Sequence, residues 1–153
     1  VISNRPEDYQ FLQVPIARDI VQIKGPLVGL YTALCISQSD YLILAGCDMP
    51  WINPDLLAHQ LSVLDQGVWE IVIPKHEDGF EPLHAVYRRS KCLIAVEAAL
   101  EAGDRSLIGW HNQVRVKAIS DDEVKRFCPD LRCFLNINTP GEFQVMLAQM
   151  SQQ

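Results

Sequence analysis

The segment Leu42-Ile-Leu-Ala-Gly-Cys-Asp48-Met-Pro50 is the most informative part of this chain for its fold. It begins as a short, continuous apolar run, which is typical of a strand that helices cover on both faces. A turn of small residues follows, with Asp48 at its tip, and then come a proline and a helical pattern. This order predicts a strand, a turn and a helix, with a carboxylate just past the carboxyl end of a buried strand.

The rest of the chain repeats this alternation. Short aliphatic runs predict strands at residues 41–45, 70–73, 114–119 and 134–137, and apolar spacing predicts helices at residues 26–37, 54–66 and 90–103. Asn53 is a cap for the second helix, and Thr139-Pro-Gly-Glu142 forms a capping box that opens a last helix. We therefore predict an α/β sandwich with a mainly parallel sheet. No linker divides the sequence, so we expect a single domain over residues 1–153.

Composition and charge exclude several classes of protein. Of the 153 residues, 48% are apolar, which suffices for one hydrophobic core and excludes a disordered chain. The net charge is −6 and the basic residues are scattered, so we expect no nucleic-acid partner. The apolar runs are far shorter than the ~20 residues that cross a bilayer, so we expect no membrane span. The five cysteines lack metal or disulfide spacing, which indicates reduced thiols and a cytoplasmic location.

Three residues near predicted strand ends and helix starts are candidates for phosphate or metal chemistry. Asp48 either binds a divalent cation, as nucleotidyl transfer needs, or forms an Asx turn into the next helix, and the segment supports both interpretations equally. Gly25 precedes Pro26 at a helix start, where free N–H groups can bind an anion or an ordinary helix simply begins. Asp19 places a second carboxylate at a strand end.

Other polar residues point to a ligand less specifically. His84 alternates with apolar neighbours, so it is either a buried strand histidine with satisfied hydrogen bonds or a catalytic base. Asn136 and Asn138 would lie on one face of the last strand, an arrangement that can hold a polar ligand.

Taken together, six motifs resemble the molybdenum cofactor guanylyltransferase family, in the family's order and over nearly the whole chain. Each motif is weak alone, whereas the ordered set is specific. The motifs are Ser3-Asn4-Arg5, Asp19, Gly25-Pro-Leu-Val-Gly-Leu30, Cys47-Asp48-Met49-Pro50, Pro82-Leu-His-Ala-Val-Tyr87 and Phe134-Leu-Asn-Ile-Asn-Thr-Pro140.

The resemblance implies a Rossmann-like nucleotidyltransferase fold, a three-layer sandwich with a mixed sheet. It also implies a reaction in which GTP and molybdenum-loaded molybdopterin give the guanine dinucleotide cofactor and pyrophosphate, with Mg²⁺. Other cofactor-biosynthesis proteins or molybdoenzymes would be partners. By position, Asp48 is the catalytic, metal-binding aspartate; Asp19, Gly25 and Asn4 are nucleotide contacts. The candidate substrate-binding residues are Asn136, Asn138 and His84.

One part of the family pattern is missing from these residues. The family begins with a strand, a Leu-Ala-Gly-Gly loop with a following Lys that holds the triphosphate, and a helix. Such a unit spans about 30 residues, so we expect the domain to be incomplete at its N-terminus and less active without this loop. Loss of a strand would also leave a sheet edge open, through which two copies could form a homo-oligomer.

Two alternatives stay open. The chain could transfer a cytidylyl group or act on a sugar phosphate, as other members of the superfamily do. It could also be a non-catalytic module that holds the cofactor.

Overall fold

The two central strands of the sheet send alternate side chains into two separate apolar cores. In β2 (Ile71–His76), Ile71 and Ile73 point to one core and Val72 to the other. In β4 (His84–Arg88), Tyr87 and Val86 divide in the same way. This alternation follows from the two-residue period of a strand, and it allows helices to cover both faces.

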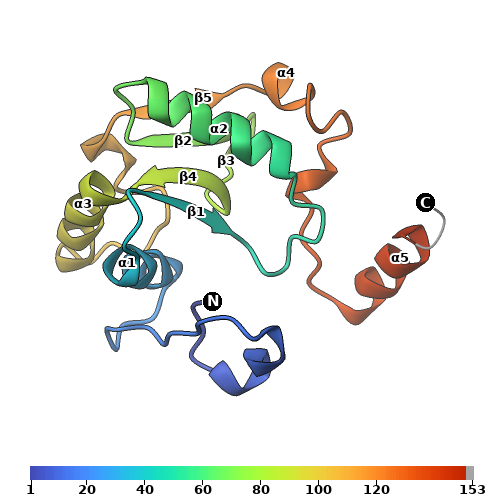
Figure 1. Ribbon diagram of the computed structural model, residues 1–153, viewed down its shortest axis with the longest axis horizontal. Coiled ribbons are helices and arrows are strands. Elements are labelled where there is room, and N and C mark those ends of the chain that lie inside the picture. Colours follow the sequence, from blue (N-terminus) through green and yellow to red (C-terminus); the bar gives the residue numbers. More distant parts are fainter. Residues whose placement is uncertain (151–153) are drawn as a thin grey trace.

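The structure is a computed structural model that describes residues 1–150. Helices and strands alternate along most of the chain (Figure 1). Besides β2 and β4, the elements are η1 (Pro6–Leu12), α1 (Pro26–Ile36), β1 (Tyr41–Ala45), α2 (Pro54–Gln66), β3 (Gly79–Phe80), α3 (Arg89–Glu101), η2 (His111–Gln113), β5 (Val116–Ile119), α4 (Asp121–Val124), η3 (Arg132–Phe134) and α5 (Pro140–Met150).

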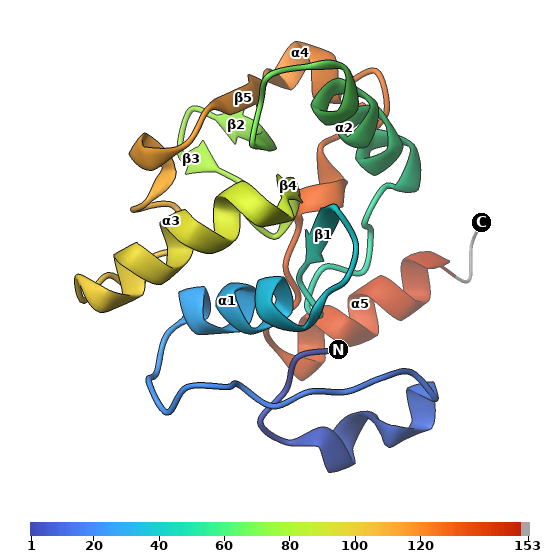
Figure 2. The same ribbon diagram turned by 60° about the vertical axis from the view of Figure 1, so that its left-hand side comes forward.

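The layers form a three-layer sandwich. Helices α1 and α3 pack together on one face of the sheet, and α2 lies on the opposite face (Figures 1 and 2). The first core joins α1 and α3 to the sheet around Tyr87 and Trp110, and the second joins α2 to it around Leu56 and Leu64. The expected α/β sandwich is therefore confirmed. Within the described part of the chain, no helix has the length and apolarity needed to cross a bilayer.

The sheet is mixed, and its parallel share is smaller than the apolar runs predict. The strands lie in the order β1-β4-β2-β3, with β5 also paired to β2. Only β2 and β5 are parallel among these strands, while β4 runs antiparallel to both β1 and β2. The reason is connectivity: a parallel pair needs a crossover of a dozen or more residues, and no helix separates β2 from β4. A separate parallel bridge joins Ile2 to Ala17 near the N-terminus.

Most predicted elements form where the sequence places them, with one exception. The helix over 54–66 has the predicted bounds, and Asn53 caps it by accepting a hydrogen bond from the Leu56 N–H at 2.9 Å. The prediction of a strand at 134–137 is wrong, because this segment ends η3 and then continues without a partner strand. Its backbone instead makes a single long-range bond, from the Ile137 N–H to the Asp48 carbonyl at 2.8 Å.

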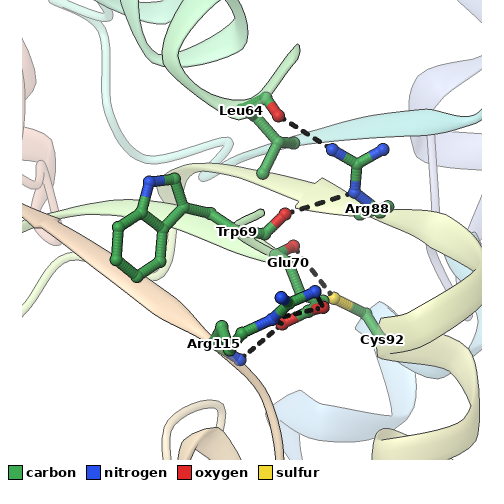
Figure 3. Close-up of polar contacts among 6 residues, drawn as sticks. All are labelled: Leu64, Trp69, Glu70, Arg88, Cys92 and Arg115. Carbon is green, nitrogen blue, oxygen red and sulfur yellow. Dashed lines mark hydrogen bonds and ion pairs between the residues drawn. The ribbon is translucent and has the colours of Figure 1, made fainter. Parts of the chain in front are cut away.

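A polar cluster fixes the amino end of β2 (Figure 3). The buried Glu70 carboxylate accepts hydrogen bonds from the Arg115 backbone N–H at 2.6 Å and from the Arg115 guanidinium. The Glu70 carbonyl accepts from the Arg88 N–H at 2.7 Å and the Cys92 thiol at 3.4 Å. These bonds join β2 to β5, β4 and α3 at one point.

Candidate functional site

A cavity of about 700 Å³ gathers the polar candidates from four separate segments of the chain. Asn4, Asp19, Gly25 and Asp48 all line it, together with apolar residues from α1 and β1. It lies at the carboxyl end of β1, and Figures 1 and 2 show the N-terminus close to α1 on this side. Ligands of open α/β sheets bind at the carboxyl ends of strands, so its position suits a binding site.

Asn4 and Asp19 form a reciprocal pair at the edge of this cavity. The Asn4 amide donates to the Asp19 carboxylate at 2.7 Å, and the Asp19 N–H donates to the Asn4 side-chain oxygen at 3.2 Å. Thr32, fully buried in α1, lies 3.5 Å from the other Asp19 oxygen and accepts from the Ile20 N–H at 3.2 Å. Thr32 is a supporting residue that sequence reasoning missed, although a polar residue on the apolar face of a predicted helix is a usable signal.

The backbone conformation at position 25 favours glycine, but some of the backbone N–H groups expected to be free beside it already donate hydrogen bonds. Its φ is +145°, and a Cβ added there would lie 2.9 Å from the Arg105 Cβ. The Leu27 N–H donates to the Arg105 carbonyl at 3.3 Å and the Val28 N–H to the Gly25 carbonyl at 3.1 Å. The prediction of free N–H groups is therefore wrong for Leu27, whose N–H bonds to the loop around Arg105, and for Val28, whose N–H bonds to Gly25 within the first turn.

Asp48 is held by its backbone while its carboxylate is left available. The Met49 N–H donates to the Gly46 carbonyl at 3.3 Å, and the Ile137 N–H donates to the Asp48 carbonyl. A Cβ at Gly46 would lie 2.7 Å from the Asp48 Oδ1, so glycine leaves the space that this carboxylate occupies. Among the described side chains, none donates a hydrogen bond to the Asp48 carboxylate.

This environment fits a hard divalent cation. Carboxylate oxygens are the ligands that Mg²⁺ prefers, and it is commonly held by one or two carboxylates together with substrate phosphates. Within residues 1–150, no three His, Cys, Asp or Glu side chains form a metal-binding cluster of their own. The available Asp48 carboxylate therefore fits a metal that a bound phosphate helps to hold, and it does not fit a metal held by protein ligands alone.

Asn136 and Asn138 lie beside the Asp48 loop, outside the cavity lining. Both side chains are exposed, and the intervening Ile137 makes the bond to Asp48. The following capping box is confirmed: the Glu142 carboxylate accepts from the Thr139 N–H at 3.0 Å, and the Glu142 N–H donates to the Thr139 hydroxyl at 3.2 Å. The hydrogen bonds from the Asn138 and Thr139 backbones lower the pKa of Glu142.

His84 has no surface to offer a substrate in this structure. It is fully buried; its Nε2 accepts from the Asn53 N–H at 3.3 Å, and its Nδ1 lies 3.3 Å from the Gln60 side-chain oxygen. Burial lowers the pKa of His84, which keeps the ring neutral. The expectation of a direct substrate contact is corrected accordingly: the buried-histidine interpretation describes its place, because α2 packs over this part of β4.

Comparisons with known proteins support the family that the sequence motifs resemble. Residues 1–116 match the MobA-like NTP transferase domain. The chain is 34% identical to the molybdenum cofactor guanylyltransferase of Syntrophotalea carbinolica, over 94% of this chain and 68% of that protein. It is 31% identical to the probable molybdenum cofactor guanylyltransferase of Peptoclostridium acidaminophilum, over 100% of this chain and 71% of that protein.

Solved structures share the fold. The molybdopterin-guanine dinucleotide biosynthesis protein A of Archaeoglobus fulgidus superimposes with a TM-score of 0.83 at 24% identity, over 99% of this chain and 78% of that one. The 4-diphosphocytidyl-2C-methyl-D-erythritol synthase of Anaerococcus prevotii gives a TM-score of 0.66 at 12% identity, over 98% of this chain and 77% of that one. The family resemblance read from the motifs is confirmed, and the chain belongs to the MobA-like NTP transferase family of nucleotidyltransferases.

Proposed function

We propose that this protein is a molybdenum cofactor guanylyltransferase, which transfers GMP from GTP to molybdopterin and releases pyrophosphate. The observation that carries the proposal is the convergence of Asn4, Asp19, Gly25 and Asp48 on one cavity. These are the positions that match the family's nucleotide and metal contacts, and three relatives named molybdenum cofactor guanylyltransferase or probable molybdenum cofactor guanylyltransferase are 31–34% identical over 94–100% of this chain.

The reaction is a substitution at phosphorus. An oxygen of the terminal phosphate of molybdopterin attacks the α-phosphorus of GTP, the bond from that phosphorus to the bridging β-phosphate oxygen breaks, and pyrophosphate leaves with the bonding electrons. Positioning and charge stabilisation supply most of the rate of such reactions. The task of the residues here is therefore to hold the two phosphates in line.

Asp48 would hold Mg²⁺ in this proposal. When bound, the cation neutralises charge on the phosphate oxygens. The two carboxylic side chains that line the cavity, Asp19 and Asp48, repel a triphosphate in the absence of a cation. Guanylyl transfer should consequently be lost when the metal is removed with EDTA and return when Mg²⁺ is added in excess.

The Asn4–Asp19 pair would position the nucleoside part of GTP. Because the two side chains satisfy each other and Thr32 braces Asp19, their remaining lone pairs and N–H groups have fixed directions. A fixed set of donors and acceptors suits recognition of a sugar or base. Asn136 and Asn138, exposed beside the Asp48 loop, would contact the acceptor substrate.

The test is guanylyl transfer by the full-length protein carrying Asp48→Asn, which keeps the side-chain shape and removes the charge. Turnover should fall at least ~100-fold, because a charge-stabilising group in a transition state contributes on that scale. Asp78→Asn, at an exposed turn between β2 and β3, is the matched control and should retain wild-type turnover. Turnover of Asp48→Asn within a few-fold of the wild type would reject the proposal.

Competition between nucleotides separates guanylyl transfer from the cytidylyl alternative. The proposal expects GTP, and not CTP, to be consumed when both are present with molybdopterin. Pterin binding without any pyrophosphate release would instead favour a non-catalytic cofactor-binding module. We place the reaction in the cytoplasm, where the five free thiols of this chain are stable in reduced form.

A further inference from the structure

A second cavity, of about 390 Å³, is lined in part by residues of the loop that carries Asp48. Residues 50–54, which follow Asp48 directly, form one wall, and residues 127–132 form the other. The loop from Gly46 to Asn53 thus has a separate cavity at each end: the site already described meets it at Gly46, Cys47 and Asp48. Nothing in the proposed role of Asp48 uses this second cavity.

Its most distinctive feature is a cation stacked on an aromatic ring. The Arg132 guanidinium carbon lies 4.7 Å from the centre of the Trp51 ring, and the Arg132 side chain keeps 43% of its surface exposed. The Asp130 carboxylate lies 3.6 Å from the Arg132 Nε and accepts from the Arg132 N–H at 3.2 Å. These contacts hold the flat guanidinium group against the ring, and part of the Arg132 side chain stays exposed to solvent.

The walls of this cavity are fixed before any ligand arrives. The Asn53 amide donates to the Phe127 carbonyl at 3.0 Å, which joins one wall to the other. The Asn53 side-chain oxygen caps α2, and the Asn53 backbone N–H donates to the buried His84 ring. Preorganised walls reduce the entropic cost of binding a rigid ligand.

We infer that this cavity binds the pterin ring of the acceptor substrate, with Trp51 and Arg132 as positioning residues; the inference rests on the proposed function. A pterin contains a flat, conjugated pyrimidine ring, and such rings stack on tryptophan faces and on guanidinium planes. The pterin carries its phosphate on a side chain, so a ring next to residues 50–54 would direct that phosphate toward Asp48. The nucleotide, in the first cavity, would meet it at Asp48, which lines that cavity.

Binding can be tested without the reaction, using 6-hydroxymethylpterin and isothermal titration calorimetry on the full-length protein. Trp51→Ala should weaken pterin binding by about ten-fold, the scale of a lost ring-on-aromatic contact, while Trp51→Phe retains most of it. Arg132→Gln should weaken it as well. Arg126→Gln is the matched control, since it removes the same charge from an exposed position outside the cavity and should change nothing.

Steady-state kinetics give a second readout. Trp51→Ala should raise the KM for molybdopterin by about ten-fold and leave the KM for GTP unchanged, because of the two substrates only the acceptor would contact this ring. Wild-type pterin affinity in both Trp51→Ala and Arg132→Gln, or a rise in the GTP KM alone, overturns the inference. If the wild type binds the pterin through Trp51 but transfers no guanylyl group, the proposed function fails and the pterin site stands.

Discussion

Replacing Glu70 with alanine should destabilise the fold without affecting the proposed site. Glu70 lies at the amino end of β2, whereas Asp48 follows the carboxyl end of β1, and these two strands point the same way because both are antiparallel to β4. The substitution removes the acceptor of the Arg115 backbone N–H, which donates to Glu70 at 2.6 Å. A half-buried donor left without a partner costs about 1–3 kcal/mol of unfolding free energy.

The ion pair itself adds little to this figure. The Arg115 side chain is 57% exposed, so water solvates its guanidinium once the carboxylate is gone. Glu70→Gln keeps an oxygen that can accept from the Arg115 N–H, so it should lose less than half as much stability as Glu70→Ala. The measurement is urea-induced unfolding of the wild type and both variants, together with their KM for GTP.

The pKa of Glu70 predicts in which direction its contribution to stability changes with pH. Hydrogen bonds from Arg115 lower the pKa of Glu70 below its ordinary value near 4.5. Its ionised form therefore stabilises the fold above about pH 4.5, and this stabilisation is lost as the pH falls through the lowered pKa. The gap between the wild type and Glu70→Gln should close in acid. Equal stability of Glu70→Ala and the wild type at pH 7, or a gap that widens in acid, would refute this reasoning.

Three further predictions concern single side chains. Burial lowers the pKa of His111 to about 4. Because the unfolded chain takes up a proton first, the free energy of unfolding should fall by up to about 3 kcal/mol between pH 6.5 and pH 4. His111→Gln should remove this fall from a pH series of urea unfolding curves. Gly25→Ala should lower the free energy of unfolding by about 1–3 kcal/mol in thermal or urea unfolding, because Gly25 has a positive φ. Gly29→Ala should be neutral or stabilising, because Gly29 lies within α1 and a Cβ added there would meet no other atom within 4 Å. Thr139→Ala should cost about 0.5–2 kcal/mol of helix stability at the start of α5, which should appear as faster amide hydrogen exchange there. Unchanged exchange would mean that the Thr139–Glu142 capping box contributes nothing.

The sequence is sufficient for the helices and for the neighbourhood of Asp48, because these depend on local patterns. Apolar spacing and the Asn53-Pro54 cap predict α2, and the apolar run before Asp48 predicts β1. Strand direction is different: the antiparallel pairing of β4 with β2 depends on the short connection between these two strands, which apolar runs do not reveal.

The same distinction between local patterns and long-range contacts applies to the residues of the candidate site. Asp48 and Asp19 could be selected because each follows a strand-like run. The burial of His84 is one of the two interpretations that its alternation with apolar neighbours offers. The pairing of Asn4 with Asp19 and the meeting of Trp51 with Arg132 are contacts between distant segments. No local pattern records these contacts, so the sequence could name Asp48 and Asp19 and could not describe their surroundings. The roles of these residues stay predictions.

The hydrogen bond from the Ile137 N–H to the Asp48 carbonyl has a consequence for exchanging parts between relatives. The matching family domain ends at residue 116, yet the backbone of Asp48 is supported from beyond that boundary. A chimera that joined residues 1–116 to the C-terminal segment of another relative would inherit a foreign support for Asp48. This part of the fold is therefore not modular at its conventional boundary, and residues 117–153 have to be transplanted together with residues 1–116.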